Sequence, residues 1–226
     1  MRSRWLPLSI LSLAAIGLMA AIVSLSVGEH REETFTITGS GEVQELIGGI
    51  PQLGDRLGSD DAPVTIDVFN DLQCTRCADY QLAVVDPLIE DYVRTGEAQM
   101  IFRHYPLGGK PVTLGGVAAE AAGEQDRQWQ YIEIFFRNLD QVPEQGVTQE
   151  FLDEIAAATP KLEVAEWERA MQGDEAEQAA RAGNDLGTQL KIPADPAIVV
   201  TGANGSEELD SAPSLADVEA AIERVG

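Results

Sequence analysis

The sequence predicts an α/β fold in which a helical insertion separates two parts of one sheet. Three observations predict it. Residues 64–69 and 99–105 are rich in β-branched and aromatic side chains, which favours two strands with a helical pattern between them. Helical periodicity then continues from residue 117 to residue 186. A further apolar run at 197–200 is typical of a buried strand.

Local signals mark the ends of these elements. The helix after the first strand contains Pro87, which should kink it, and Gly96 should close it. Asn204-Gly205 predicts a hairpin after the strand at 197–200. A closing helix is expected over residues 215–225.

The insertion, expected at about 108–190, contains several helices. Thr148 is expected to cap a helix over 151–158. Further helices are expected at 162–171 and at 176–186, with the last one closed by Gly187. The aromatic residues near 129–136 are interpreted as packing residues.

The chain has two cysteines, Cys74 and Cys77, at the junction between the first strand and its helix. A Cys-x-x-Cys pair there is the arrangement of a thioredoxin-like redox site. At a helix start, unpaired N–H groups and the helix dipole favour a thiolate. We therefore assign Cys74 as the exposed nucleophile and Cys77 as the resolving thiol. A static structural disulfide is the alternative.

The chain carries 15 Lys and Arg residues against 38 Asp and Glu residues, a net charge of −23. This charge argues against nucleic-acid binding, which requires a basic face. A large acidic excess suits a solvated surface outside the cytoplasm.

The first 28 residues are interpreted as a cytoplasmic tip and a transmembrane signal-anchor. Residues 5–27 contain no charged residue, and Arg2 and Arg4 precede them. This pattern predicts a bilayer-spanning helix with the N-terminus in the cytoplasm and the remainder outside. A cleaved signal peptide is the alternative. Both place the cysteines where a disulfide can persist.

Residues 29–57 are interpreted as a linker or stalk, because several glycines interrupt them. An added strand at 34–38 or a short helix at 42–47 is compatible with this segment. The redox domain is then expected over residues 58–226.

Several segments in this order resemble DsbA-family thiol:disulfide oxidoreductases, especially membrane-anchored bacterial members. The matching segments are residues 61–66, 71–77, 102–107, 118–125 with Trp129, and 195–198. The resemblance implies a thioredoxin fold with a helical insertion, a redox pair at Cys74 and Cys77, and a cis-proline at Pro196 that helps to hold substrate. Pro193 is the competing position.

Three departures from the family pattern bear on the site. Thr75 and Arg76 stand between the cysteines, where the family often has an aromatic residue or histidine. Val68 stands six positions before the first cysteine, where the family often has a buried acid. The adjacent Asp67 should face the other side of the strand and be solvated. Asp195 stands before the cis-proline, where threonine or valine is common. Its carboxylate should oppose a thiolate at the site, whereas Arg76 should favour one.

The resemblance implies an exported enzyme that oxidises reduced extracytoplasmic proteins and is itself reoxidised by a membrane partner. No cofactor and no metal are expected. A reductase or isomerase of the same fold is the alternative within the class. A Cu(I)-binding protein that uses the two thiolates is the alternative outside it. His30 and His104 are interpreted as incidental.

Overall fold

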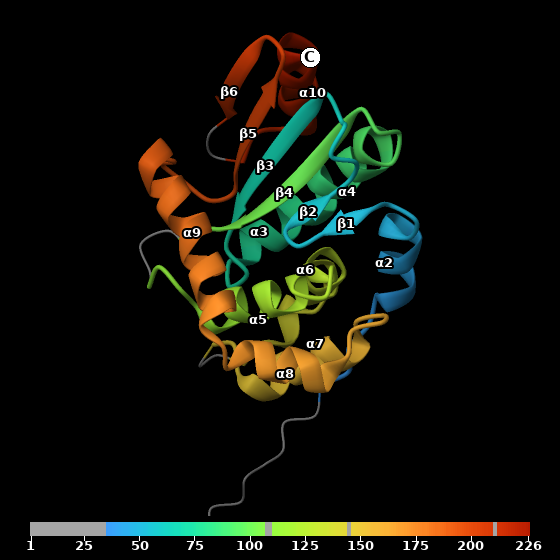
Figure 1. Ribbon diagram of the computed structural model, residues 1–226, viewed down its shortest axis with the longest axis vertical. Helices are drawn as coiled ribbons and strands as arrows, with labels where there is room; N and C mark the ends of the chain where they lie inside the picture. Colours follow the sequence, from blue (N-terminus) through green and yellow to red (C-terminus); the bar gives the residue numbers. More distant parts are fainter. Residues whose placement is uncertain (1–34, 107–109, 144–145, 210–211) are drawn as a thin grey trace, which may run out of the picture. The chain divides into compact units, whose positions relative to one another are not determined.

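The computed structural model describes residues 35–106, 110–143, 146–209 and 212–226 (Figure 1). The elements in chain order are α2 (Ser40–Ile47), β1 (Gln52–Leu53), β2 (Arg56–Leu57), β3 (Val64–Asn70), α3 (Thr75–Tyr80), η1 (Gln81–Val85), α4 (Asp86–Leu88), η2 (Ile89–Val93), β4 (Ala98–His104), α5 (Leu114–Gly123), α6 (Gln128–Arg137), η3 (Leu139–Gln141), α7 (Gln149–Ala158), α8 (Val164–Met171), α9 (Asp174–Leu190), β5 (Ala197–Gly202), β6 (Gly205–Leu209) and α10 (Leu215–Val225).

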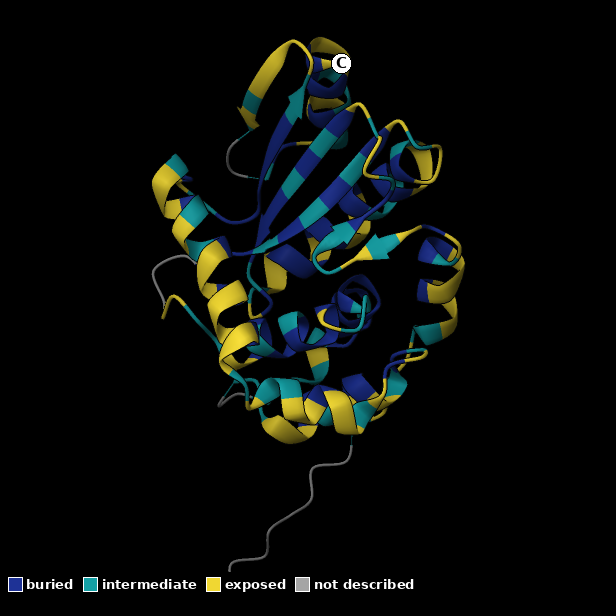
Figure 2. Ribbon diagram, in the orientation of Figure 1, coloured by how far each residue is buried: buried dark blue, intermediate teal, exposed yellow. Residues whose placement is uncertain are grey.

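These elements form one mixed sheet with helices around it. The strand order is β1-β2-β4-β3-β5-β6, with β3 parallel to β4 and antiparallel to β5. Buried and partly exposed residues alternate along β4, as Figure 2 shows. The hairpin predicted at Asn204-Gly205 joins β5 to β6, where Gly202 pairs with Gly205. The predicted α/β fold with an insertion is therefore confirmed.

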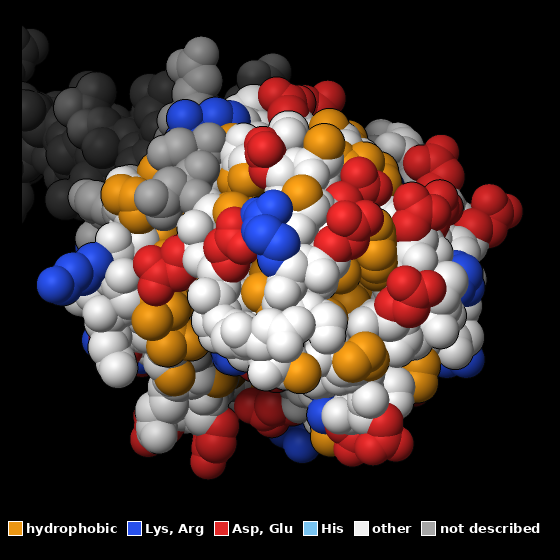
Figure 3. All heavy atoms as spheres, turned by 90° about the horizontal axis from the view of Figure 1, so that it is seen from above, with side chains coloured by type: hydrophobic (Ala, Val, Ile, Leu, Met, Phe, Trp, Pro, Cys, Tyr) orange, Lys and Arg blue, Asp and Glu red, His pale blue; other side chains and the backbone are white. Residues whose placement is uncertain are grey.

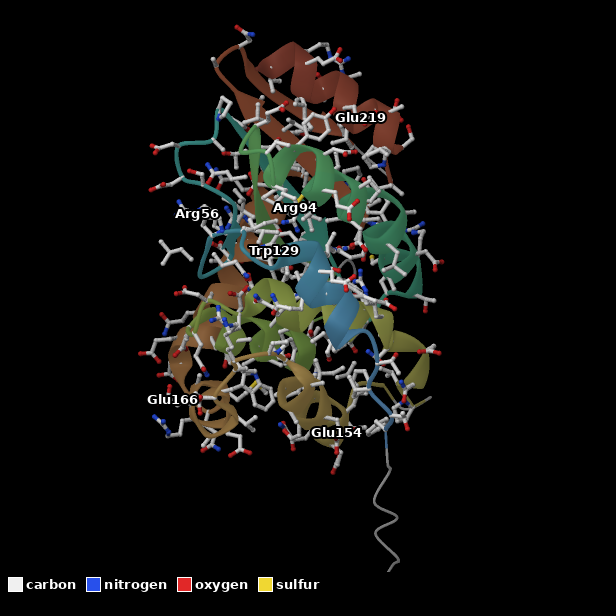
Figure 4. The ribbon with its side chains drawn as sticks, turned by 90° about the vertical axis from the view of Figure 1, so that its right-hand side faces the viewer. Arg56, Arg94, Trp129, Glu154, Glu166 and Glu219 are labelled. Atoms are coloured by element: carbon white, nitrogen blue, oxygen red, sulfur yellow. The ribbon has the colours of Figure 1, made fainter. Side chains whose placement is uncertain are left out.

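The insertion consists of α5 to α9 and lies between β4 and β5 in the chain (Figure 1). Its helices share one hydrophobic core with the sheet, and the largest fully buried side chains include Trp129, Trp167, Tyr131 and Phe102. The indole of Trp129 donates a hydrogen bond to the backbone oxygen of Asp55 at 2.8 Å, and Figure 4 shows this residue among the central elements. Thr148 caps α7 as predicted, since its hydroxyl accepts from the Phe151 amide.

The folded domain begins upstream of Gly58, so the interpretation of residues 35–57 as a stalk needs correction. The strand β2 pairs with β4, and α2 buries Val43 and Ile47 in the core. Arg94 donates hydrogen bonds to carbonyl oxygens of Glu45, Leu46 and Gly48 at the end of α2 (Figure 4). A cation suits the negative end of a helix dipole. The short strand considered at 34–38 is absent from the described residues 35–38, which are held by side chains instead: Gln141 bonds both backbone groups of Thr36.

The prediction that Gly187 closes the last insertion helix is wrong. Helix α9 continues through it to Leu190, and the C-cap residue Lys191 has the left-handed φ of 59°. A Cβ atom at Gly187 would lie 2.6 Å from a ring carbon of Tyr105. This glycine therefore provides close packing of α9 against the end of β4, and it does not provide a helix stop.

The helix that follows the cysteines changes its hydrogen-bond pattern around Pro87. Two π-helical turns, η1 and η2, flank the three residues of α4. Proline lacks the amide hydrogen that an α-helix uses, and a π-helical turn is one way to accommodate that loss. The element continues to Val93 with helical dihedral angles, and Gly96 follows it with a φ of 83°.

The predicted anchor at residues 5–27 lies outside the described residues. Among the residues that the structure describes, no helix combines the length and the apolar character needed to cross a bilayer.

Candidate active site

The two cysteines lie at the start of α3, immediately after the loop that follows β3. Cys74 is the N-cap residue with extended dihedral angles, and its sulfur accepts a hydrogen bond from the Cys77 amide at 3.3 Å. Cys74 is partly exposed, whereas Cys77 is completely buried, and both are free thiols. This geometry leaves one sulfur accessible and shields the other.

The buried thiol of Cys77 is hard to ionise. Burial raises the pKa of Cys77 far above its ordinary value, and the hydrogen bond with Cys74 and the charge of Asp195 add to this effect. A Cys77 thiolate in this buried position is therefore high in free energy. The Cys77 proton must be removed before its sulfur can attack a disulfide.

The loop before β5 lies beside the cysteine pair. The peptide bond between Asp195 and Pro196 is cis. β5 begins at the next residue, Ala197, which pairs with Phe69 near the end of β3. Adjacent strands thus bring the start of β5 and the loop after β3 to the same edge of the sheet.

Asp195 and Arg76 meet at this edge. The Arg76 guanidinium donates a hydrogen bond to the backbone oxygen of Asp195 at 2.5 Å and lies 3.8 Å from its carboxylate. The Arg76 side chain is 65% exposed and that of Asp195 is 12% exposed. The sulfur atoms of Cys74 and Cys77 and a carboxylate oxygen of Asp195 all lie within 4.8 Å of one another. Thr75 is exposed at the first turn of α3.

The position on β3 six residues before Cys74 holds no acid. Val68 is buried there among apolar neighbours. We expected Asp67 to be solvated, but its carboxylate pairs with Arg103 at 2.7 Å. Arg103 also pairs with Asp55 at 2.8 Å. The Asp67 side chain is thus held in an ion-pair network on a different face of β3 from Val68.

A buried polar chain near the active-site helix was not predicted from the sequence. Asn70 donates to Gln81 at 3.3 Å, and Gln81 donates to Glu133 at 2.7 Å. Burial and the charge of Asp86 raise the pKa of Glu133, Arg137 opposes them, and the net result is a pKa of about 8. The one signal in the sequence was the spacing of Gln81, four residues after Cys77 and on the same helical face. Glu133 gave no such signal within its aromatic helix.

The comparisons with known proteins agree with this geometry. A family model described as thioredoxin matches residues 54–224. A probable disulfide bond formation protein D from Bacillus anthracis is 30% identical over 166 residues, which cover 72% of this chain and 76% of that protein. The chain belongs to the DsbA-like group of the thioredoxin family.

Other DsbA-like relatives extend the comparison. The disulfide bond formation protein D of Bacillus subtilis is 26% identical over 69% of this chain and 72% of that protein. The crystal structure of oxidised BdbD from Bacillus subtilis superposes with a TM-score of 0.62 at 21% identity, covering 77% of this chain and 95% of that chain. The crystal structure of DsbA from Chlamydia trachomatis superposes with a TM-score of 0.62 at 20% identity, covering 75% of this chain and 89% of that chain. These structures share the fold of this DsbA-like chain.

His104 of this DsbA-like protein takes no part in the group formed by the two cysteines and Asp195. His104 is buried, its Nε2 lies 3.1 Å from the Thr113 hydroxyl, and burial lowers its pKa to about 4. His30 lies outside the described residues. His104 therefore remains neutral at physiological pH and serves packing.

Proposed function

We propose that this protein forms disulfide bonds in extracytoplasmic proteins. It is a thiol:disulfide oxidoreductase of the DsbA-like group, and the direction of exchange is our proposal. The observation that carries it is the pairing of a partly exposed Cys74 at a helix N-cap with a buried Cys77, next to a cis-proline loop. The naming of its relatives as disulfide bond formation proteins supports the same direction.

The reaction proceeds by two exchanges. A substrate thiolate attacks the Cys74 sulfur of the oxidised enzyme, the Cys74–Cys77 bond breaks, and its electron pair goes to Cys77, which gains a proton. A second substrate thiol loses its proton and attacks the substrate sulfur joined to Cys74. The substrate leaves with a disulfide, and the enzyme leaves as the dithiol.

The neighbouring residues have separate roles in this proposal. Pro196 and its loop help to hold an extended substrate segment beside Cys74. Thr75 and Arg76 adjust the stability of the reduced form, since both lie between the sulfurs in sequence and are exposed to a partner. The free energy of a thiolate at Cys74 falls with a nearby cation and with the helix N-terminus.

We also propose that residues 5–27 hold the domain at the outer face of a membrane, with a membrane partner that accepts its electrons. The uncharged segment and the arginines before it support this proposal. Fractionation of cells that express the chain, with protease added to intact spheroplasts, tests it. A membrane-bound, protease-sensitive domain is expected, and release of the full-length chain into the soluble fraction would contradict an anchor.

The test of the function is the reduction potential together with oxidation of a reduced, unfolded substrate protein. The reduction potential is about −120 mV for DsbA and about −270 mV for thioredoxin. A potential towards the first value, with formation of disulfides in the substrate protein, is expected. Cys74→Ser should abolish exchange, and Cys77→Ser should accumulate the mixed disulfide. A potential towards the second value would make the protein a reductase, and repair of scrambled disulfides without net oxidation would make it an isomerase.

The Cu(I) alternative is disfavoured by the chemistry of the site. Cu(I) prefers soft ligands, and the third group beside the sulfurs is a hard carboxylate from Asp195. Retention of copper by the purified reduced protein, without exchange activity, would support that alternative.

A further inference from the structure

The proton of Cys77 has no acceptor on β3 at the position six residues before Cys74. Val68 occupies that position and is fully buried. The neighbouring Asp67 is paired with Arg103. Cys77 must nevertheless lose a proton each time the dithiol is reoxidised, and gain one each time the disulfide is opened.

Asp195 provides a carboxylate beside the cysteine pair, from the loop before β5. A carboxylate oxygen of this residue and both sulfur atoms lie within 4.8 Å of one another. The side chain is 12% exposed, so bulk water reaches it poorly. At this separation one bridging water molecule, or a small rotation of the carboxylate, connects the oxygen to a sulfur.

The surroundings hold Asp195 in this place. The residue is joined by a cis peptide bond to Pro196, and its backbone oxygen accepts the hydrogen bond from Arg76. The charged and titratable groups that face its carboxylate are Arg76, Cys74 and Cys77 from the active-site helix and its N-cap, and Asp71 from the loop before it. Arg76 is the cation of this set, and it forms an ion pair with the Asp195 carboxylate beside the buried thiol.

We propose that Asp195 is the acid–base group for Cys77, in place of an acid on β3. This inference rests on the proposed thiol:disulfide exchange and deepens it. During reoxidation by a disulfide, Cys74 first loses its proton and attacks one sulfur of the oxidant, whose S–S bond breaks, so that its other half leaves as a thiol and a mixed disulfide remains on Cys74. Asp195 then accepts the Cys77 proton, the Cys77 sulfur attacks the Cys74 sulfur, and the oxidant's thiolate leaves with the electron pair and is protonated from solvent. In the direction of substrate oxidation, Asp195 returns the proton to Cys77 as the enzyme disulfide opens.

A purely electrostatic role for Asp195 predicts the opposite result from the acid–base role. A negative charge beside the sulfurs disfavours both thiolates, so its removal should accelerate both Cys74 attack and Cys77 attack. Removal of a proton acceptor should slow Cys77 attack alone. General acid–base groups contribute about 10²- to 10⁴-fold to such steps, so a partly compensated loss of about 10- to 100-fold is expected.

The experiment uses the full chain in detergent micelles, reduced and then mixed with excess oxidised glutathione. Acid quenching at successive times and intact-mass measurement follow the dithiol, the Cys74–glutathione mixed disulfide and the final disulfide. The variants are Asp195→Asn, the conservative Asp195→Glu, and Asp79→Asn as a matched control, because Asp79 is an exposed carboxylate on the active-site helix. Each variant is also made with Cys77→Ser, so that attack by Cys74 is measured alone.

The proposal expects the mixed disulfide to accumulate in Asp195→Asn, with its resolution slowed about 10- to 100-fold at pH 7 and partly restored in Asp195→Glu. The resolution rate in Asp195→Asn should rise about tenfold per pH unit, because Cys77 then loses its proton to solvent, whereas the parent rate should vary less. Asp79→Asn should match the parent.

Resolution that is unchanged or faster in Asp195→Asn overturns the proposal, and so does an equal slowing of Cys74 attack in the Cys77→Ser background. Failure of the proposed function is a separate result: the parent would exchange with glutathione but form no disulfides in a reduced protein substrate.

Discussion

Arg76 of the active-site helix donates a hydrogen bond to the backbone oxygen of Asp195, the residue before the cis-proline, at 2.5 Å. This contact joins the helix that follows Cys74 to the loop that lies beside the cysteine pair. Arg76 lies between the cysteines in sequence. Its side chain therefore contributes a positive charge to the site and also links the active-site helix to the loop before β5.

The substitution Arg76→Ala should make the protein a weaker oxidant. Loss of the cation destabilises the thiolate of the reduced form, which favours the disulfide and lowers the reduction potential. Because the side chain is 65% exposed, solvent screens the effect, and a shift of about 10–20 mV to more negative values is expected. Equilibration with glutathione buffers measures it. Arg169→Ala on α8, another exposed arginine, is the control and should leave the potential unchanged. A more positive potential in Arg76→Ala would contradict this role.

The free energy of unfolding should decrease as the pH rises from acidic to alkaline values, because Glu120 is buried. Burial raises the pKa of this carboxyl from 4.5 to about 8, and the charge of Asp55 adds to the shift. Since the folded-state pKa is the higher one, the stabilisation is complete below about 4.5 and is lost as the pH rises through about 8. Glu120→Gln removes this dependence.

Urea unfolding at pH 5 and pH 8 tests the Glu120 prediction. The free energy of unfolding of Glu120→Gln should exceed that of the parent by about 2 kcal/mol more at pH 8 than at pH 5. This difference is a fraction of what the full pKa shift would give. Glu124→Gln, on an exposed neighbour, is the matched control. Equal gains of Glu120→Gln at both pH values would show that Glu120 ionises normally in the folded protein.

The substitution Gly187→Ala should destabilise the fold by about 1–3 kcal/mol, as overpacking does. The new methyl group would lie 2.6 Å from the ring of Tyr105, which is buried and whose hydroxyl donates to the Ile192 carbonyl oxygen. The control Gly41→Ala places a methyl group in open space within α2 and should stabilise by about 0.5–1 kcal/mol. Thermal or urea unfolding measures both, and a stabilised Gly187→Ala would refute the close packing of α9 on Tyr105.

A chain that begins at Gly58 should be much less stable than one that begins at Phe35. The shorter chain lacks α2, β1 and β2 and therefore the buried side chains of Val43, Leu46, Ile47 and Leu57. Each such side chain contributes about 1.5–3 kcal/mol, so the sum is comparable with the total stability of a domain, about 5–15 kcal/mol. Circular dichroism and urea unfolding of both chains measure the difference. Equal midpoints would mean that residues 35–57 are a stalk after all.

The acidic surface has a consequence for handling the protein. Figure 3 shows one face on which red Asp and Glu side chains predominate over blue Lys and Arg side chains. Such a surface disfavours self-association of the folded domain and makes binding to nucleic acid unfavourable, in line with the net charge of −23.

The sequence by itself determined the cysteine pair, the strands at β3, β4 and β5, the hairpin and the closing helix, because each depends on local spacing, turn chemistry and apolar periodicity. It also placed Pro196 directly before β5. Local patterns did not reveal the packing of residues 35–57, since the glycines there resemble a linker until β2 pairs with β4, a strand far along the chain.

Tertiary structure alone decided the partners of the charged groups and the role of Gly187. Helix-ending and close packing both select glycine, and only the position of the Tyr105 ring distinguishes them at Gly187. Asp67 and Arg103 lie on paired strands, and Asp195 approaches Cys77 only because β5 starts beside the end of β3. Electrostatic interactions depend on distance and burial between residues far apart in the chain, which no local pattern encodes.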